Sequence, residues 1–512
     1  MIPKLSTNIL SLLFEELEEE ISTLYSCILV NRDWCQEAIR FLWKNPWKSF
    51  IDKYKDKRYK ILFECFLMMM SKESKEFLDS NGIKIENLIS TKKNYSLQTT
   101  LFNYTSFCKV INLNIINNMI NYNINNIKDK NLKFEFSIKD HYQKYLINQE
   151  ILKLLISNTS KLSILILSCE FPQPIATFPN SFISLSQLNE LHCYGPINEV
   201  IFYGLSQLCR NIEKLVIEGY DQKKNRKNRG LRLLIEQQTN LKRVKFSNYY
   251  DDYRYISQIS YSELGKALAA KSSSIIELDF DYFNPILLRF LNKFQDNLTI
   301  FKFNISCKII ELSTIKEYEE YLKDISFTNL QQLVIYYYCC HFEIIQKVIE
   351  KTNRGIKKIN IGIYDKCNED EKDDKLIPII TKHCPKLELL SALVDNLDEI
   401  KELIMECQNL RGLVIRTNEL KDIEFFKVLY NDSTNKFRKL QLSNGWTISE
   451  RALNELFENW KQQKRNSLDF YIPFHIYEDK YENIFKKYQE LGVIRNFYKF
   501  TDEDANFLDS WG

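Results

Sequence analysis

A short hydrophobic pattern recurs along most of the chain at nearly constant spacing. In each copy the first, fourth and sixth residues are apolar, and a small or polar residue often precedes the first. Between residues 162 and 437 the starts of the copies lie about 27.5 residues apart on average. Eleven copies follow this rule: Leu162-Leu165-Leu167, Leu188-Leu191-Cys193, Ile212-Leu215-Ile217, Leu241-Val244-Phe246, Ile275-Leu278-Phe280, Leu298-Phe301-Phe303, Leu330-Leu333-Ile335, Ile356-Ile359-Ile361, Leu387-Leu390-Ala392, Leu410-Leu413-Ile415 and Phe437-Leu440-Leu442.

Each copy predicts one β-strand whose apolar residues point to the same side. Parallel strands need a crossover, and the remaining residues of each period, about 15–20, are enough for a helix. The pattern and its period resemble those of leucine-rich repeats. We therefore expect an α/β horseshoe, with a parallel sheet on its concave face and helices on its convex face. A further copy, Val110-Leu113-Ile115, lies upstream, and the gap before residue 162 has room for one degenerate repeat.

The third, fifth and seventh residues of each copy are expected on the concave face, where a target would bind. Their charges are mixed, which favours a folded protein as partner over a phosphate backbone. The alternative is mutual neutralisation, in which Arg243 and Lys245 pair with Glu277 and Asp279 of the next strand. The residues we expect to bind a target are Glu190, His192, Tyr194, Arg243, Lys245, Glu277, Asp279, Tyr336 and Arg416.

The first 48 residues show helical spacing instead, and they predict three short helices. Pro46 prevents the third helix from continuing. Three helices of this size cannot bury all of their apolar groups. The surplus is expected either at a protein interface or against the first repeat, as an N-terminal cap. The apolar positions of the helices are Ile9, Leu10, Leu13, Phe14 and Leu17, then Ile21, Leu24, Tyr25, Ile28 and Leu29, then Trp34, Ala38, Ile39 and Leu42.

Three segments of this region resemble an F-box: Ile9-Leu10-x-x-Leu13-Phe14-x-x-Leu17, Cys27-Ile28-Leu29-Val30-Asn31-Arg32-x-Trp34-Cys35 and Leu42-Trp43-x-x-Pro46-Trp47. The family implies a helical module that docks onto a Skp-type adaptor and through it onto a cullin ubiquitin ligase. The family commonly begins Leu-Pro, whereas the aligned pair here is Leu5-Ser6. The adaptor-contact positions implied by the resemblance are Leu5, Ile9, Leu10, Leu13, Phe14, Leu29, Val30 and Trp34.

The resemblance implies the substrate-recognition subunit of an SCF-type E3 ubiquitin ligase, whose repeats bind a target protein. The alternative is a ligase-independent scaffold, in which the helices serve only as a cap. We expect no catalytic residue, cofactor or metal. The chain has no G-x-S-x-G, H-E-x-x-H or Gly-rich phosphate loop, and its five histidines are widely separated.

Charge and composition narrow the possible partners. With 70 basic and 67 acidic residues, the net charge of +3 predicts no general affinity for nucleic acid. The basic run at residues 223–229 is interpreted as a solvated loop rather than a nucleic-acid or nuclear-import patch. The acidic run at residues 368–374 lacks the order of a calcium loop. No membrane contact is expected, because the apolar run at residues 61–70 is half the length of a span.

The cysteines and the N-terminus bear on location. The 13 cysteines are scattered without a C-x-x-C pair, and no secretory signal is visible, which favours reduced thiols in the cytoplasm or nucleus. The predicted organisation has four parts: residues 1–48 as the F-box-like module, 49–105 as a helical linker, 106–485 as the solenoid and 486–512 as a C-terminal cap or tail. Within the linker, Leu62, Phe63, Phe66 and Leu67 are expected in the core.

Overall fold

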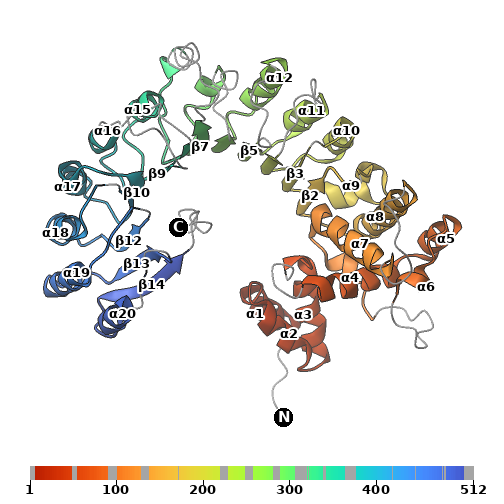
Figure 1. The fold of residues 1–512 in the computed structure, drawn as a ribbon. Helices are drawn as coiled ribbons and strands as arrows, with labels where there is room; N and C mark the ends of the chain where they lie inside the picture. The colour runs from red at the N-terminus through yellow and green to blue at the C-terminus, as the bar shows by residue number, and fades with distance from the viewer. Residues whose placement is uncertain are drawn as a thin grey trace. The chain divides into compact units, whose positions relative to one another are not determined.

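A computed structural model of the protein divides the chain into two compact units, Met1–Tyr250 and Asp251–Gly512. Both units are α/β, and helices alternate with parallel strands in the repeat region of each (Figure 1). The structure describes residues 6–48, 55–89, 101–128, 138–170, 172–195, 197–218, 229–247, 258–280, 289–305, 320, 322–337, 342–363, 376–417, 419–443, 445–474, 477 and 480–500.

The first unit begins with six described helices, of which the first three lie where the apolar spacing predicts them. They are α1 (Thr7–Glu16), α2 (Ile21–Ile28), α3 (Arg32–Lys44), α4 (Lys55–Met69), α5 (Lys72–Ser80) and α6 (Ile85–Leu88). Asn31 caps α3, because its side chain accepts a hydrogen bond from the Trp34 backbone N–H at 3.0 Å. Ser6 occupies the same position at α1, but its side chain makes no capping hydrogen bond. The predicted core residues of α4 are buried: Leu62, Phe63, Phe66 and Leu67.

Five parallel strands follow one another in chain order within the first unit. They are β1 (Val110–Asn112), β2 (Ile164–Ser168), β3 (Glu190–Tyr194), β4 (Lys214–Glu218) and β5 (Arg243–Ser247). The helices between them are α7 (Leu113–Lys128), α8 (Ile138–Asn158), α9 (Ser181–Leu185), α10 (Glu199–Leu208) and α11 (Arg229–Gln237). The strands and helices therefore alternate as the repeat pattern predicts.

The second unit continues the same alternation with nine described strands, each parallel to the next. The strands are β6 (Glu277–Phe280), β7 (Ile300–Ile305), β8 (Gln332–Tyr337), β9 (Lys358–Ile363), β10 (Leu389–Leu393), β11 (Gly412–Arg416), β12 (Lys439–Leu442), β13 (Leu468–Pro473) and β14 (Ile494–Phe500). The helices are α12 (Gln258–Ala269), α15 (Phe342–Glu350), α16 (Leu376–His383), α17 (Leu397–Glu406), α18 (Asp422–Asp432), α19 (Glu450–Gln462) and α20 (Tyr481–Glu490). Within this unit α15 to α20 line one side of the strands (Figure 1).

The core consists of the recurring apolar triplets stacked from strand to strand. Every residue of the eleven predicted triplets is buried, none with more than 7% of its surface exposed. The backbone repeats the same contact from copy to copy: the Asn189 carbonyl, for example, accepts hydrogen bonds from the N–H groups of Glu213 and Lys214 at 2.8 and 3.0 Å. Because each triplet is covered by its neighbours, stacking stabilises every repeat through the next. The predicted parallel strands are confirmed.

Two boundaries differ from the prediction. The described residues of the gap before residue 162 contain no further strand: β1 pairs directly with β2, and the helices α7 and α8 lie between them in sequence. The Val110-Leu113-Ile115 copy is a strand only as far as Asn112, and Leu113 begins α7. At the other end, β14 pairs with β13 in parallel, so the strand series extends to Phe500 rather than ending at residue 485.

Candidate protein-interaction surfaces

The helices α1–α3 enclose a small core of their own. It contains Leu10, Phe14, Leu24, Cys27 and Ala38, with Trp34 packed against it. The rings of Phe14 and Trp34 meet edge to face with centroids 5.5 Å apart. Leu10 and Phe14, which the resemblance places at the adaptor, are 1% and 0% exposed. In this structure these two residues hold the helices together and offer no surface to a partner.

Other apolar side chains of the same helices are exposed. Ile9 and Leu13 on α1 are 47% and 44% exposed, and Leu29 and Val30 in the turn after α2 are 86% and 56% exposed. The Asn31 cap fixes that turn at the start of α3. Leu12 is also exposed at 64%, although the sequence did not single it out. Leu5 lies outside the described residues.

A second side of this helical module packs onto the strands. The Trp47 indole N–H donates a hydrogen bond to the Val110 carbonyl of β1 at 2.7 Å, and its ring lies 5.9 Å from that of Phe66. Trp43 stacks on Tyr104 at 4.8 Å. The Lys44 carbonyl accepts a hydrogen bond from the Lys109 N–H at 2.9 Å. The apolar surplus is therefore divided: Trp47 packs on the outermost described strand of the first unit and Trp43 on Tyr104, whereas Ile9, Leu13, Leu29 and Val30 remain exposed.

A cleft of about 590 Å³ lies between α2, α3 and α4. Its walls are mainly apolar, and its rim carries the ion pairs Lys44–Glu18 and Lys48–Glu19, the second at 2.5 Å. No sequence pattern predicted this cleft, because its lining comes from segments far apart in the chain. The apolar wall residues include Leu24, Tyr25, Ile28, Leu42, Ile61, Leu62 and Val110.

On the strand face of the first unit, the predicted target-binding residues form ion pairs with their neighbours. Glu190 accepts from Lys214 at 3.3 Å and from His192 at 3.2 Å, and Lys245 pairs with Glu218 at 2.8 Å. Tyr194 is half-buried on the same face. Neutralisation thus occurs between adjacent strands of this unit, and Glu218 of β4 is one partner of Lys245.

The pKa values of His192 and Glu190 both lie below their usual values. Burial lowers the pKa of His192, although its hydrogen bond to Glu190 acts in the opposite direction. Burial alone would raise the pKa of Glu190, but the hydrogen bond from His192 and the charge of Lys214 bring it below its usual value. Unlike Glu190 and His192, Arg243 has an exposed side chain, and it forms no ion pair with any residue in the described part of the chain.

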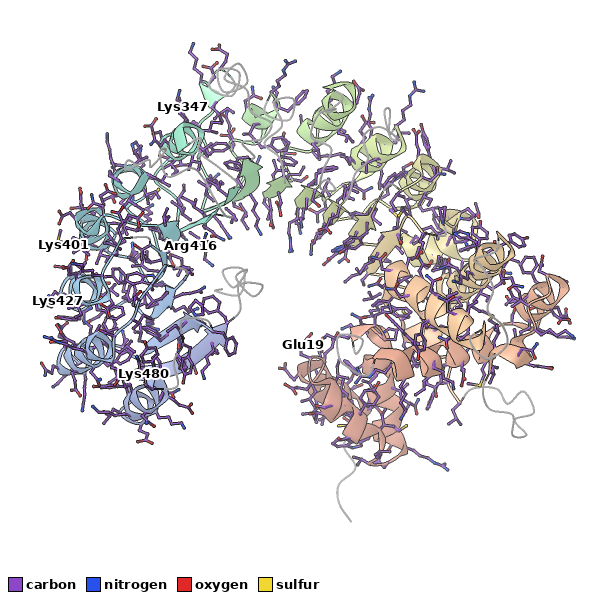
Figure 2. All side chains as sticks on the ribbon, in the orientation of Figure 1. Glu19, Lys347, Lys401, Arg416, Lys427 and Lys480 are labelled. Carbon is purple, nitrogen blue, oxygen red and sulfur yellow. The ribbon has the colours of Figure 1, made fainter. Side chains whose placement is uncertain are left out.

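The strand face of the second unit is mixed in polarity. Glu277 pairs with Lys302 at 3.3 Å, and Asp279 is only 9% exposed. Arg416 is half-buried, and Figure 2 shows it on the strand side, away from the helix residues Lys401 and Lys427. The side chain of Tyr336 lies outside the described residues. Toward the end of the chain this face carries a buried apolar cluster: Leu389, Val414, Tyr471 and Phe500.

The two charged runs noted in the sequence lie almost entirely outside the residues that the structure describes. The basic run, apart from Arg229 at the start of α11, and the whole acidic run lie outside the described residues. Among the residues that are described, no group of three or more His, Cys, Asp or Glu side chains could hold a metal ion. In the same part of the chain, no helix is long and apolar enough to cross a membrane.

Comparisons with known proteins add no assignment. A scan against protein-family models finds no match, and a search of curated proteins finds none either.

Proposed function

We propose that the chain is the substrate-recognition subunit of an SCF-type (Skp–cullin–F-box) E3 ubiquitin ligase. In this proposal α1–α3 form an F-box that docks a Skp-type adaptor, and the strand–helix units are leucine-rich repeats of a horseshoe that binds a target protein. Catalysis belongs to the partner subunits. The chain contributes proximity, by holding the target close to the ubiquitin donor.

One observation carries the proposal: four apolar side chains at the F-box contact positions are exposed on a module whose core is already filled. These residues are Ile9, Leu13, Leu29 and Val30. Covering exposed apolar groups with a partner lowers the free energy, and such clusters mark protein-interaction sites. Leu10, Phe14 and Trp34 then support the contact indirectly, because they fix the helices that present it.

The strand faces support the second half of the proposal. Both signs of charge occur on them, and Glu190–Lys214, Glu218–Lys245 and Glu277–Lys302 pair, which suits a folded protein surface better than a polyanion. Arg243 is the most available of the predicted target-binding residues, since it is exposed and makes no ion pair with the described residues. We therefore assign it to an acidic group of the target.

Co-purification with a Skp-type adaptor tests the proposal. The full chain should retain the adaptor, and Leu13→Asp and Leu29→Asp should each weaken binding by roughly 30-fold or more, the effect of losing a central interface residue. Val200→Asp is the matched control, because Val200 is 66% exposed on α10, away from α1–α3, and should bind as the unchanged chain does. Equal binding by all four proteins would contradict the proposed surface.

The packing of Trp43 and Trp47 favours a second candidate function. Trp47 covers the outermost described strand of the first unit and Trp43 packs on the preceding Tyr104, which is what a structural cap does. A chain whose helices served only as a cap would be a ligase-independent scaffold. Failure of the unchanged, folded chain to retain any Skp-type adaptor would support this candidate over the ligase subunit.

A further inference from the structure

A polar pocket of about 350 Å³ lies in the first unit, where α1 and α3 meet the segments that precede β1 and β2. Its volume falls within the range of small-molecule sites, roughly 300–1,000 Å³. The lining contains four basic, two acidic and three serine side chains, together with two phenylalanines. None of these residues is an adaptor-contact position, so the pocket is separate from the surface assigned above.

Arg40 of α3 is held in this pocket from two sides. Its Nη1 group donates to the two carboxylate oxygens of Glu37 at 3.2 and 3.3 Å, and Glu37 is only 3% exposed. The guanidinium also lies over the ring of Phe107, 5.7 Å from the ring centre. The edge formed by Nε and Nη2 has no acceptor among the described residues. This edge can bind two oxygens of one anion side by side.

Two lysines of the lining are uncommitted. The side chains of Lys109 and Lys161 are exposed and form no ion pair or hydrogen bond within the described part of the chain. The backbone of Lys109 is fixed, because its N–H donates to the Lys44 carbonyl at 2.9 Å and its carbonyl accepts from the Ser163 N–H at 2.8 Å. The fourth cation, Lys44, already pairs with Glu18. The donors open to a ligand are therefore Lys109, Lys161 and the free edge of Arg40.

The remaining lining residues define the kind of anion that fits. Glu15 is the one acidic side chain of the lining without an ion pair among the described residues, so two unpaired positive charges face one negative charge. Ser11 and Ser160 add hydroxyl groups that make no hydrogen bond with described residues. A carboxylate has only two oxygens, which the Arg40 edge alone would satisfy, whereas a phosphate monoester has three terminal oxygens for the guanidinium, ammonium and hydroxyl donors.

We propose that this pocket binds a small phosphate monoester. The Arg40 edge binds two phosphate oxygens, Lys109 and Lys161 neutralise the charge, and the organic part of the ligand packs against Phe41 and Phe107. The ligand contacts α1 and α3 on one side and the segments before β1 and β2 on the other. Its binding therefore stabilises the folded first unit.

The inference does not depend on adaptor docking. Ser11 and Glu15 lie roughly 160° around α1 from Ile9 and Leu13, because successive residues of a helix are about 100° apart. The pocket and the proposed adaptor surface thus use opposite sides of α1, and a ligand in the pocket leaves Ile9 and Leu13 exposed.

Isothermal titration calorimetry on the full chain at low ionic strength tests the proposal, with phenyl phosphate as the probe. The unchanged chain should bind it with a Kd of about 1 mM or tighter. Benzoate carries the same ring on a carboxylate and should bind at least about tenfold more weakly. Equal binding of the two probes would overturn the assignment to phosphate. A phosphoserine peptide that binds more tightly than phenyl phosphate would overturn the assignment to a small molecule.

Substitutions locate the binding site. Lys109→Gln and Lys161→Gln should each weaken phenyl phosphate binding at least about fivefold, since each removes one charge-assisted contact. Glu15→Gln should strengthen binding about threefold, because it removes a like charge. Lys84→Gln is the matched control: Lys84 is exposed, has no ion pair with described residues and does not line the pocket, so binding should not change.

Arg40→Gln should abolish measurable binding, but it also leaves the buried Glu37 without its partner. The exposed lysines are therefore the decisive positions, and thermal unfolding followed by circular dichroism checks that every variant is folded. Equal binding by the Lys109, Lys161 and Lys84 variants, or no binding to the unchanged chain at about 10 mM phenyl phosphate, would overturn the proposal. Retention of a Skp-type adaptor, measured separately, reports on the proposed function alone.

Discussion

Replacing Trp47 tests whether the N-terminal helices stabilise the strand series of the first unit. Its indole is 3% exposed, packs beside Phe66, and donates a hydrogen bond to the Val110 carbonyl at 2.7 Å. β1 is the outermost described strand of this unit, so its outer edge would otherwise expose unpaired backbone groups. Trp47→Ala removes both the packing and the hydrogen bond, and Trp47→Phe removes chiefly the hydrogen bond.

The two substitutions should differ in magnitude. A buried tryptophan replaced by alanine typically lowers the free energy of unfolding by about 3–5 kcal/mol, because it removes apolar contacts and leaves a cavity. Loss of one hydrogen bond to a buried carbonyl costs about 1 kcal/mol, so Trp47→Phe should lower it by about that much. Leu29→Ala is the control: Leu29 is 86% exposed, and its replacement should change stability by less than about 0.5 kcal/mol.

Urea unfolding followed by circular dichroism measures these differences without relying on tryptophan fluorescence. Hydrogen exchange at residues 110–112 adds a local measurement, since Trp47→Ala should speed exchange in β1 more than in β5. If Trp47→Ala shifts the urea midpoint no more than Leu29→Ala, and exchange in β1 is unchanged, the helices do not stabilise the strand edge and the reasoning fails.

Three further predictions follow from local geometry. Gly445→Ala should lower the free energy of unfolding by more than about 2 kcal/mol, because Gly445 has φ +95° and a Cβ would lie 1.5 Å from the Thr417 carbonyl oxygen; urea unfolding measures this. Since burial holds the pKa of His192 below its unfolded value, the unfolded state binds the proton first, and stability should fall as the pH drops below about 6.5; His192→Gln should flatten that slope in urea titrations. Iodoacetamide should label the exposed Cys169 well before Cys193, whose pKa is raised by complete burial, as followed by mass spectrometry.

Each of these three predictions has a control or an outcome that would contradict it. Gly492 also has a positive φ, +71°, but a Cβ there meets nothing within 4 Å, so Gly492→Ala should cost less than Gly445→Ala. A pH slope that is the same in His192→Gln and the unchanged chain would contradict the assignment to His192. Equal labelling of Cys169 and Cys193 in the native protein would show that the third strand of the first unit is not packed as described.

The repeating apolar triplets allowed most of the strands to be predicted from the sequence. The triplet that contains Leu113 is an exception, because α7 rather than a strand begins there. The side chain of Asn112 accepts a hydrogen bond from the Ile115 N–H at 3.2 Å, which is the geometry of a helix N-cap. Apolar residues three positions apart occur both in the repeat pattern that predicts a strand and on one face of a helix, so this spacing alone is ambiguous. The Asn112 cap therefore starts the helix α7 at Leu113. The repeat pattern considers only apolar positions, so it did not include this cap.

The last two strands escaped prediction because polar residues replace one member of each triplet. Ser467 stands at the first position before β13, and its hydroxyl donates a hydrogen bond to the Gly492 carbonyl at 2.8 Å. Lys499 stands at the sixth position of β14, with its amine 3.5 Å from the centre of the Tyr477 ring. Both polar groups are satisfied within the fold, so the strands form without three apolar residues.

The sequence predicted three helices in the first 48 residues, which the structure contains, but not which of their side chains face outward. Ile9 and Leu10 are adjacent and equally apolar, yet one step around α1 leaves Ile9 47% exposed and Leu10 1% exposed. What separates them is the position of α3, whose Trp34 and Ala38 close over Leu10 and Phe14. Such an assignment depends on how helices pack, which the spacing of apolar residues alone does not determine.

The same limit explains why the fold is easier to predict than the partner. Stacking demands apolar residues at three positions of each copy and leaves the face positions to vary. On those positions the outcome depends on side-chain reach: Lys245 lies opposite Val216 in register but pairs with Glu218, two residues farther along β4. A charge counted from the sequence as available to a target is in this way satisfied by its neighbour. Arg243 lies opposite Lys214 of β4 in register, and its side chain is exposed.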